Sequence, residues 1–307
     1  MLASFSSLIE MLEVLPDERA CREYLEGSVW VDGVPTCPYC KSKRHYELKE
    51  SGNFNGLYKC GDCRKRYTVR IGTIFEGSHI PLRKWFIAIY IFTMHKKGIS
   101  SHQLARDLGI TQRSSWFLLQ RLRGAITTKE AVSGEVQVDE MFIGGKNKNR
   151  HWDKKVKNSC GRSFKDKTPV FGMAYDGKVQ CVVVPNTKAA TIQPIIYEKV
   201  ELGSTIYSDE WMAYKGIGAH YNHEVVDHGR GQYTNGKATT NAMEGFWSFL
   251  KRGLTGIYHR VTPRHLARYC DEFVFRYNTR KDTPQARFNF VLQNSQRLTY
   301  QMLIAKA

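Results

Sequence analysis

The chain has 307 residues, of which 42% are hydrophobic and 24% charged, and its net charge is +17. This composition excludes a chain that is disordered throughout, and no apolar run approaches the roughly 20 residues of a membrane span. The N-terminus lacks the basic region and cleavage site of a secretory signal, so we expect a cytoplasmic protein. The excess positive charge suits a polyanion, with nucleic acid favoured over an anionic membrane.

Positive charge is densest in one stretch near the N-terminus. Residues 1–35 are expected to form a short helical segment with an acidic balance. Residues 37–126 contain 17 Lys and Arg against 5 Asp and Glu, a net charge of +12. This stretch is therefore the first place to look for a module that binds a polyanion.

Four cysteines in the basic stretch follow the pattern C-x2-C-x19-C-x2-C, and they are Cys37, Cys40, Cys60 and Cys63. Two such knuckles supply four thiolates to one tetrahedral site, which predicts a zinc ribbon over residues 36–75 with a structural Zn²⁺. Two disulfides are the alternative, and a reducing cytosol disfavours them. Residues 44–58 are expected to form a hairpin with Ser51, Gly52 and Asn53 at its tip.

The remaining cysteines show no ligand or partner spacing, and we interpret them as small buried hydrophobic residues: Cys21, Cys160, Cys181 and Cys270.

Residues 80–127 are expected to form a helical region that contains a helix-turn-helix. An apolar helix is predicted over 82–95, followed by a helix that Ser100 or Ser101 caps. Gly109 provides the turn, and Thr111 caps a second helix. That helix begins with three polar residues at the positions where recognition helices meet base edges, Gln112, Arg113 and Ser114.

The helical pair also has a plainer interpretation, an ordinary helical hairpin. Ser115 stands where an apolar core residue is usual in a helix-turn-helix, and we expect Trp116 to take its place in the core. The location of the pair inside the most basic stretch favours the DNA-reading interpretation.

A strand-rich pattern begins after a boundary near residues 127–133 and predicts an α/β domain over 132–290, with a tail over 291–307. A helix at about 190–201 separates the third strand from the fourth. The order β-β-β-α-β-α-β-α is that of a ribonuclease H-like fold, a mixed sheet flanked by helices. The expected strands are 135–143, 169–176, 179–184, 204–209 and about 223–227.

The first and second strands are joined by a long segment, 146–168, that contains nine Lys or Arg and two Asp. We expect a mobile basic loop, which is either a solvated linker or a clamp for phosphates beside an active site.

Three carboxylates are placed where they can share one site. Asp139 lies in the middle of the first strand, although strands disfavour aspartate, and Asp209 ends the fourth strand. Glu244 lies on a helix that Thr240 or Asn241 opens as its cap. Lys251 follows Glu244 by two helical turns and so projects from the same face.

These residues resemble the catalytic set of the DDE transposases, in which a gap of about 34 residues separates the second aspartate from the glutamate. The full layout, from about residue 15 to 290, resembles bacterial insertion-sequence transposases of the zinc-ribbon type. It includes VDEMFIGGK, YSDEWMAY, NAMEGFWSFLKR and EFVFRYNTR after the four-cysteine ribbon.

The resemblance implies an enzyme that binds the terminal inverted repeats of its element, cuts them and joins the 3′ ends to target DNA. Two Mg²⁺ or Mn²⁺ ions would be held by Asp139, Asp209 and Glu244, because hard cations prefer carboxylate oxygens. Lys251 and Arg252 would contact DNA. The enzyme would act as a homo-oligomer assembled on DNA, in association with the nucleoid.

Several alternatives stay open at this point. Glu140 and Glu210 are rival ligands, although strand alternation points Glu140 away from Asp139. Asn241 is a rival to Glu244 for the third position, and we interpret it either as the helix cap or as a residue that supports the metal ligands without contacting the metal. A DNA-binding protein derived from a transposase and a metal-dependent nuclease are the competing functions. No role beyond packing or DNA contact is assigned to His259, Tyr277, Asn278 and Arg280.

Overall fold

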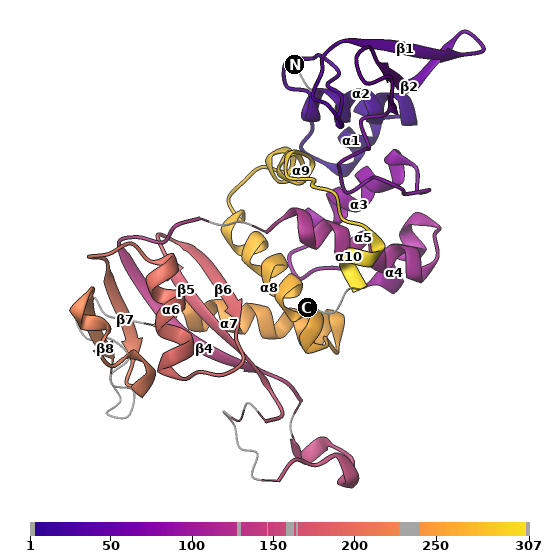
Figure 1. The fold of residues 1–307 in the computed structure, drawn as a ribbon. Helices are drawn as coiled ribbons and strands as arrows, with labels where there is room; N and C mark the ends of the chain where they lie inside the picture. The colour runs from indigo at the N-terminus through magenta and orange to yellow at the C-terminus, as the bar shows by residue number, and fades with distance from the viewer. Residues whose placement is uncertain are drawn as a thin grey trace. The chain divides into compact units, whose positions relative to one another are not determined.

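The computed structural model describes residues 4–127, 130–145, 147–157, 163, 165–226 and 240–304 (Figure 1). The chain divides into two compact units, one formed by residues 1–127 together with 281–307 and the other by residues 128–280. In the described part of the chain, no helix is both long and apolar enough to cross a membrane.

The N-terminal part of the first unit combines two capped helices with a small antiparallel sheet in the order β1-β2-β3. Ser51 and Gly52 turn between β1 and β2 with positive φ angles of 48° and 83°, as the predicted hairpin requires. The elements are α1 (Leu8–Val14), α2 (Glu18–Val29), β1 (His45–Glu50), β2 (Asn53–Cys60) and β3 (Arg66–Tyr67).

In the described part of the first unit, five further helices follow, and the two expected to form a helix-turn-helix are α4 and α5. The Ser100 hydroxyl accepts from the first turn of α4, Gly109 adopts φ 57° between the helices, and Thr111 caps α5. These helices and their turn are confirmed, whereas DNA reading by the pair stays a prediction. The helices are α3 (Leu82–Met94), α4 (Ser101–Leu108), α5 (Gln112–Ala125), α9 (Pro284–Gln293) and α10 (Tyr300–Ile304).

The expectation for Ser115 and Trp116 is wrong. Ser115 is itself fully buried on the inward face of α5, together with Leu118 and Leu122. Trp116 is half-buried and lies edge-on to Phe117, with ring centroids 4.9 Å apart. The helical repeat explains the difference, because position 115 shares a face with 118 and 122 and position 116 does not.

The C-terminal segment belongs to the first unit, and the unit that contains the five-stranded sheet ends at Arg280 rather than at residue 290. Phe288 of α9 is fully buried, and its ring contacts those of Phe5, Tyr24 and Phe86 edge-on. Aromatic packing of this kind holds α9 in the N-terminal core, which the hydrophobic pattern of α9 alone does not reveal.

The second unit is built on a five-stranded mixed sheet in the order β6-β5-β4-β7-β8. β5 pairs antiparallel with β4 and β6, whereas β7 pairs parallel with β4 and β8. The predicted α/β fold, a mixed sheet flanked by helices, is confirmed. Its main elements are β4 (Glu135–Ile143), β5 (Thr168–Tyr175), β6 (Lys178–Val183), α6 (Ala189–Lys199), β7 (Thr205–Asp209), β8 (Asn222–Val226), α7 (Asn241–Gly253), the π-helical turn η6 (Leu254–Tyr258) and α8 (Pro263–Asn278).

The helix expected between the fourth and fifth strands is absent from the described residues there. Two 3-10 turns occupy that connection, η3 (Met212–Tyr214) and η4 (Ile217–Ala219). Gly216 separates them with φ 97°, a conformation that ends a helix.

Helices cover both faces of the sheet (Figure 1). On one face, Val136 and Val138 of β4 share a hydrophobic cluster with Ile192 and Ile196 of α6. On the other face, a second cluster joins Met141 to residues of α7 and α8. Side chains along β4 therefore alternate between α6 and the α7–α8 pair, which decides where each acidic residue of this strand points.

Candidate active site and zinc site

Asp139 and Asp209 lie at corresponding positions on neighbouring parallel strands. Gln137 of β4 pairs with Tyr207 of β7, and both aspartates stand two residues further along. Asp209 is also the last residue of β7. The parallel pairing of the two strands thus brings these side chains, 70 positions apart in sequence, to the same level of the sheet.

Strand alternation sends the two acidic residues of β4 to opposite faces. The Trp247 indole of α7 donates a hydrogen bond of 3.0 Å to Asp139 Oδ2. Glu140 instead accepts a hydrogen bond from the hydroxyl of Tyr214, which belongs to the cluster on the α6 face. Asp139 therefore faces α7, and the opposite orientation predicted for Glu140 is confirmed.

Helix α7 presents Glu244 and Lys251 together. Its apolar face is buried against the sheet, while Glu244 and Lys251 stay exposed. Both line a cavity of about 410 Å³ that also contains Asp139. The remaining lining residues are Glu140, Met141, Phe142, Trp247 and Ser248. Two of the predicted carboxylates and the predicted lysine thus share one cavity, with Asp209 on the adjacent strand.

Burial raises the pKa of Asp139 to about 6. The Glu140 amide and the Trp247 indole act in the opposite direction by hydrogen bonding, whereas the negative charges of Asp209 and Glu244 raise the pKa further. The three carboxylates are therefore near enough to interact electrostatically. In the described part of the chain, however, the oxygen atoms of the three carboxylates do not all lie within 4.8 Å of one another.

Asp209 is oriented by the chain that follows it. The backbone N–H of Trp211 donates a hydrogen bond of 3.0 Å to Asp209 Oδ1. This short turn holds the carboxylate at the strand end.

Gly172 is a determinant of this site that the sequence analysis missed. It lies directly opposite Asp139 on β5. A Cβ atom at Gly172 would stand 2.2 Å from Met243 Cε and 2.5 Å from Trp247 Cζ2. Only glycine therefore lets α7 approach the sheet at the level of Asp139. The available signal was a glycine inside an apolar strand, which often marks close packing.

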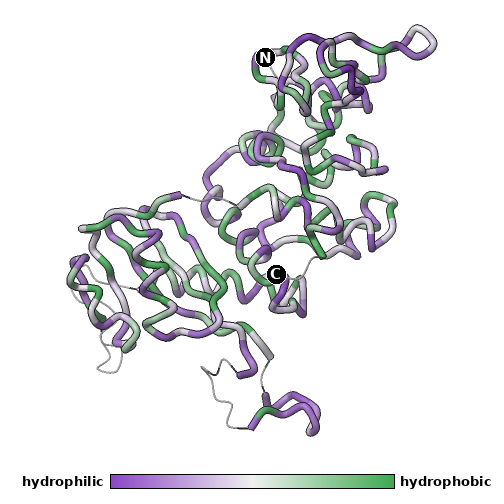
Figure 2. The backbone as a smooth tube through the Cα atoms, viewed as in Figure 1, coloured by the Kyte–Doolittle hydropathy of each residue, from purple (hydrophilic) through white to green (hydrophobic). Residues whose placement is uncertain are grey.

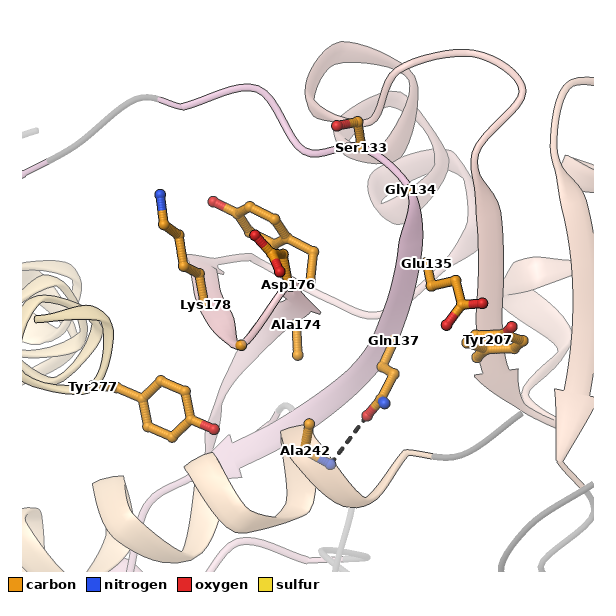
Figure 3. Close-up of a pocket in the computed structure, with 12 residues that line it drawn as sticks. Ser133, Gly134, Glu135, Gln137, Ala174, Asp176, Lys178, Tyr207, Ala242 and Tyr277 are labelled. Carbon is orange, nitrogen blue, oxygen red and sulfur yellow. Dashed lines mark hydrogen bonds between the residues drawn. The ribbon is translucent and has the colours of Figure 1, made fainter. Parts of the chain in front are cut away.

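The N-terminus of α7 is capped from the sheet. The Gln137 side chain accepts a hydrogen bond of 3.0 Å from the Ala242 N–H (Figure 3). Thr240 occupies the N-cap position without a side-chain cap bond, and Asn241 is the first residue of the helix. The cap role expected of Asn241 is thus wrong, because β4 supplies the acceptor. The cavity drawn in Figure 3, of about 440 Å³, contains none of the predicted site residues.

The end of α8 explains two residues that the sequence left without a role. Asn278 exchanges two hydrogen bonds with the backbone of Val179, of 2.8 and 2.9 Å. Arg280 donates to the Gly177 carbonyl at 2.9 Å, and its guanidinium lies 4.2 Å from the centroid of the Tyr277 ring. These contacts pair the backbone of Val179 on the edge strand β6 and anchor the end of α8 to the β5–β6 hairpin.

The four cysteines of the ribbon converge as predicted. Their sulfur atoms all lie within 4.8 Å of one another. The Sγ atoms of Cys37 and Cys63 are 3.6 Å apart, and those of Cys40 and Cys60 are 3.5 Å apart. A tetrahedral zinc with Zn–S bonds of about 2.3 Å separates its sulfurs by about 3.8 Å, so this cluster fits a structural Zn²⁺.

The other cysteines are free thiols wherever the structure describes them. Cys21 and Cys270 are buried as predicted, whereas Cys181 is only half-buried. Cys160 lies outside the described residues.

The predicted DNA-contacting residues lie on exposed or half-exposed helix surface. Gln112 and Arg113 are exposed at the start of α5, and Arg252 is exposed near the end of α7. Gln112 donates to the Ser101 hydroxyl at 2.8 Å, and Ser114 interacts with Thr111. Their contact with bases or phosphates stays a prediction.

Comparisons with known proteins agree with this architecture. Residues 131–278 match the family described as ISXO2-like transposase domain, and residues 16–66 match the family described as transposase zinc-ribbon domain. A protein of the transposable element ISH50 from Halobacterium salinarum is 29% identical over 280 residues, which is 86% of this chain and 92% of that protein. A transposase-like protein from Haemophilus influenzae is 31% identical over 102 residues, or 33% of this chain and 81% of that protein.

Proposed function

Because the chain belongs to the zinc-ribbon transposases of insertion sequences with an ISXO2-like transposase domain, we propose that it cuts the ends of a mobile element and joins them to target DNA. The observation that carries this proposal is that Asp139, Glu244 and Lys251 line one cavity, while Asp209 lies at the corresponding position of the neighbouring parallel strand.

The donor set fits a hard divalent cation. Carboxylate oxygens suit Mg²⁺ or Mn²⁺. Burial, together with the charges of Asp209 and Glu244, disfavours an ionised Asp139, and a bound cation would offset this cost. We propose that these three residues hold two such ions. When bound, the ions activate the attacking oxygen and stabilise the leaving oxygen of a phosphodiester bond.

The remaining residues of the site bind and orient DNA. Lys251 stays exposed beside Glu244, where its ammonium can contact a phosphate of the cleaved strand. Trp247 holds Asp139 in place through its indole N–H, so it positions the carboxylate. Arg252 extends the basic surface of α7.

The first unit recognises the element ends in this proposal. Gln112, Arg113 and Ser114 start α5, where side chains of a recognition helix meet base edges. The zinc ribbon adds a second basic module, and its four thiolates stabilise its fold through Zn²⁺. The active protein is a homo-oligomer assembled on both DNA ends in the cytoplasm.

One assay tests the proposal. The protein is incubated with labelled DNA from the flanks of its own gene, with Mg²⁺, with Mn²⁺ or with EDTA. We expect nicks at the element ends and joined products with either metal, and neither product with EDTA or in Asp139→Asn. Binding without cleavage would identify a DNA-binding protein, and cleavage without joining or end preference would identify a nuclease.

A further inference from the structure

The segment between β4 and β5 carries a feature that the proposed function does not use. Its described part, residues 147–157, forms two 3-10 turns, η1 (Asn147–Asn149) and η2 (Trp152–Lys154). The Asn147 side chain donates to the Val156 carbonyl at 2.8 Å and accepts from its N–H at 3.0 Å. These two bonds tie the ends of the segment together, so residues 147–157 form a small platform.

Trp152 stands at the centre of this platform and is 80% exposed. Tryptophan side chains are mostly buried on average, because their large apolar surface is costly in water. Apart from Val156, the rest of the platform is hydrophilic (Figure 2), and it carries five Lys or Arg against one Asp. A partner for Trp152 must therefore offer both a flat apolar face and negative charge.

A nucleic acid meets both conditions. Nucleobases stack on aromatic side chains, and phosphates attract the surrounding lysines. A second copy of the same platform does not, because its equal positive charge repels. A paired duplex hides its base faces inside the stack, so only an unpaired base can stack on Trp152.

The platform leaves the sheet on the side of the active site. β4 runs from Asp139 to its end at Ile143 in four residues, a rise of about 13 Å. B-form DNA covers that distance in about four base pairs. A DNA duplex that follows β4 from a scissile phosphate at Asp139 would therefore reach the end of this strand, four residues before the platform begins.

We propose that Trp152 stacks on an unpaired nucleobase close to the cleaved phosphodiester, while the lysines of the platform hold the adjoining backbone. This inference rests on the proposed function for the identity of the DNA. It adds an unpaired base beside the cut as a feature that the protein recognises directly.

The test measures stacking without cleavage. Asp139→Asn protein is mixed with element-end DNA that carries 2-aminopurine within a few nucleotides of the cleavage position, either paired or in an unpaired flank. We expect the unpaired probe to lose fluorescence on binding, because stacking on Trp152 quenches it. Adding Trp152→Ala should abolish the quenching and weaken binding of this probe about tenfold, and Trp152→Phe should restore most of both.

Two comparisons keep the result specific. Trp152→Ala should leave binding of the fully paired probe and the melting temperature unchanged, because the side chain is exposed. A Lys154→Ala/Lys155→Ala variant on the same platform should weaken binding of both probes alike and flatten the salt dependence.

The inference fails if Trp152→Ala leaves quenching and affinity for the unpaired probe unchanged, or weakens both probes equally. A change in the oligomeric state of the protein in solution on Trp152→Ala would also overturn the inference, in favour of a contact between protein copies. These outcomes differ from a failure of the proposed function, which would show as absent cleavage in the unsubstituted protein whatever the binding assays report.

Discussion

At the scale of single residues, the raised pKa of Asp139 links stability to pH. The pKa rises from 3.8 to about 6 on folding, because the carboxyl group is buried and has other carboxylates as neighbours. Between these two values the folded protein retains a proton that the unfolded chain has released. Without metal, the free energy of unfolding should therefore fall as pH rises through this window, by at most about 3 kcal/mol.

Asp139→Asn removes this ionisation while it keeps the size of the side chain. At pH 7.5 in EDTA the variant should unfold at a higher temperature than the unsubstituted protein, and at pH 4 the difference should disappear. Mg²⁺ should raise the melting temperature only of the unsubstituted protein. Thermal unfolding at both pH values checks this, and cleavage by Asp139→Asn at the normal rate would refute the catalytic assignment.

Single substitutions distinguish Glu244 from Asn241 as the third catalytic position. Glu244→Gln keeps the shape of the exposed side chain in the active-site cavity but removes its charge. DNA binding should persist while cleavage falls by orders of magnitude, since charge stabilisation of the transition state is lost. The measurement is single-turnover cleavage alongside equilibrium binding.

Asn241→Ala is the matched variant one helical turn earlier. Because Gln137 caps α7 and Asn241 is the first helical residue, this change should alter the free energy of unfolding by less than about 1 kcal/mol and leave cleavage intact. An inactive Asn241→Ala with an active Glu244→Gln would move the third catalytic position to Asn241.

At the scale of elements, Gly172 controls how closely α7 approaches the sheet. Gly172→Ala would place a methyl group against Met243 and Trp247 of this helix. We expect a loss of about 1–3 kcal/mol in stability, and reduced cleavage because α7 carries Glu244. Gly245→Ala is the control, since a Cβ there meets nothing within 4 Å and alanine favours a helix. Equal behaviour of the two variants in unfolding and cleavage assays would contradict this account.

The zinc ribbon is an element whose fold depends on its ligands. Cys37→Ser removes one of four sulfurs from the cluster, and should lower the zinc content and weaken binding to the element ends. Cys21→Ala changes a buried thiol outside the cluster and should retain zinc. Metal analysis of both variants, together with a DNA-binding titration, checks this prediction. A zinc-free native protein would show that the four thiols serve another purpose.

At the scale of the whole molecule, the last 27 residues complete the first unit. A chain that ends at Arg280 loses α9 and with it Phe288, which packs against three aromatic rings of the N-terminal core. We expect this truncation to lower the stability of the first unit by several kcal/mol and to abolish binding to the element ends. A chain that ends at Ile304 should behave normally. Two resolved unfolding transitions would show which unit is affected.

Much of this protein was predictable because its signals are local. Ligand spacing identified the cysteine cluster, alternation of apolar residues identified β4 and the opposite faces of Asp139 and Glu140, and the caps at Ser100 and Thr111 placed two helices. Each depends on residues that are close in sequence, so backbone geometry alone determines them.

Only the tertiary structure decided the features that depend on distant partners. Gln137 rather than Asn241 caps α7. Gly172 leaves the space in which that helix packs against the sheet. Phe288 packs α9 into the N-terminal core. In each case the contact joins segments far apart in the chain, and the residue itself carries no sign of its partner. The amino-acid sequence determined which side chains could perform the chemistry, whereas packing decided which backbone groups and cavities they meet.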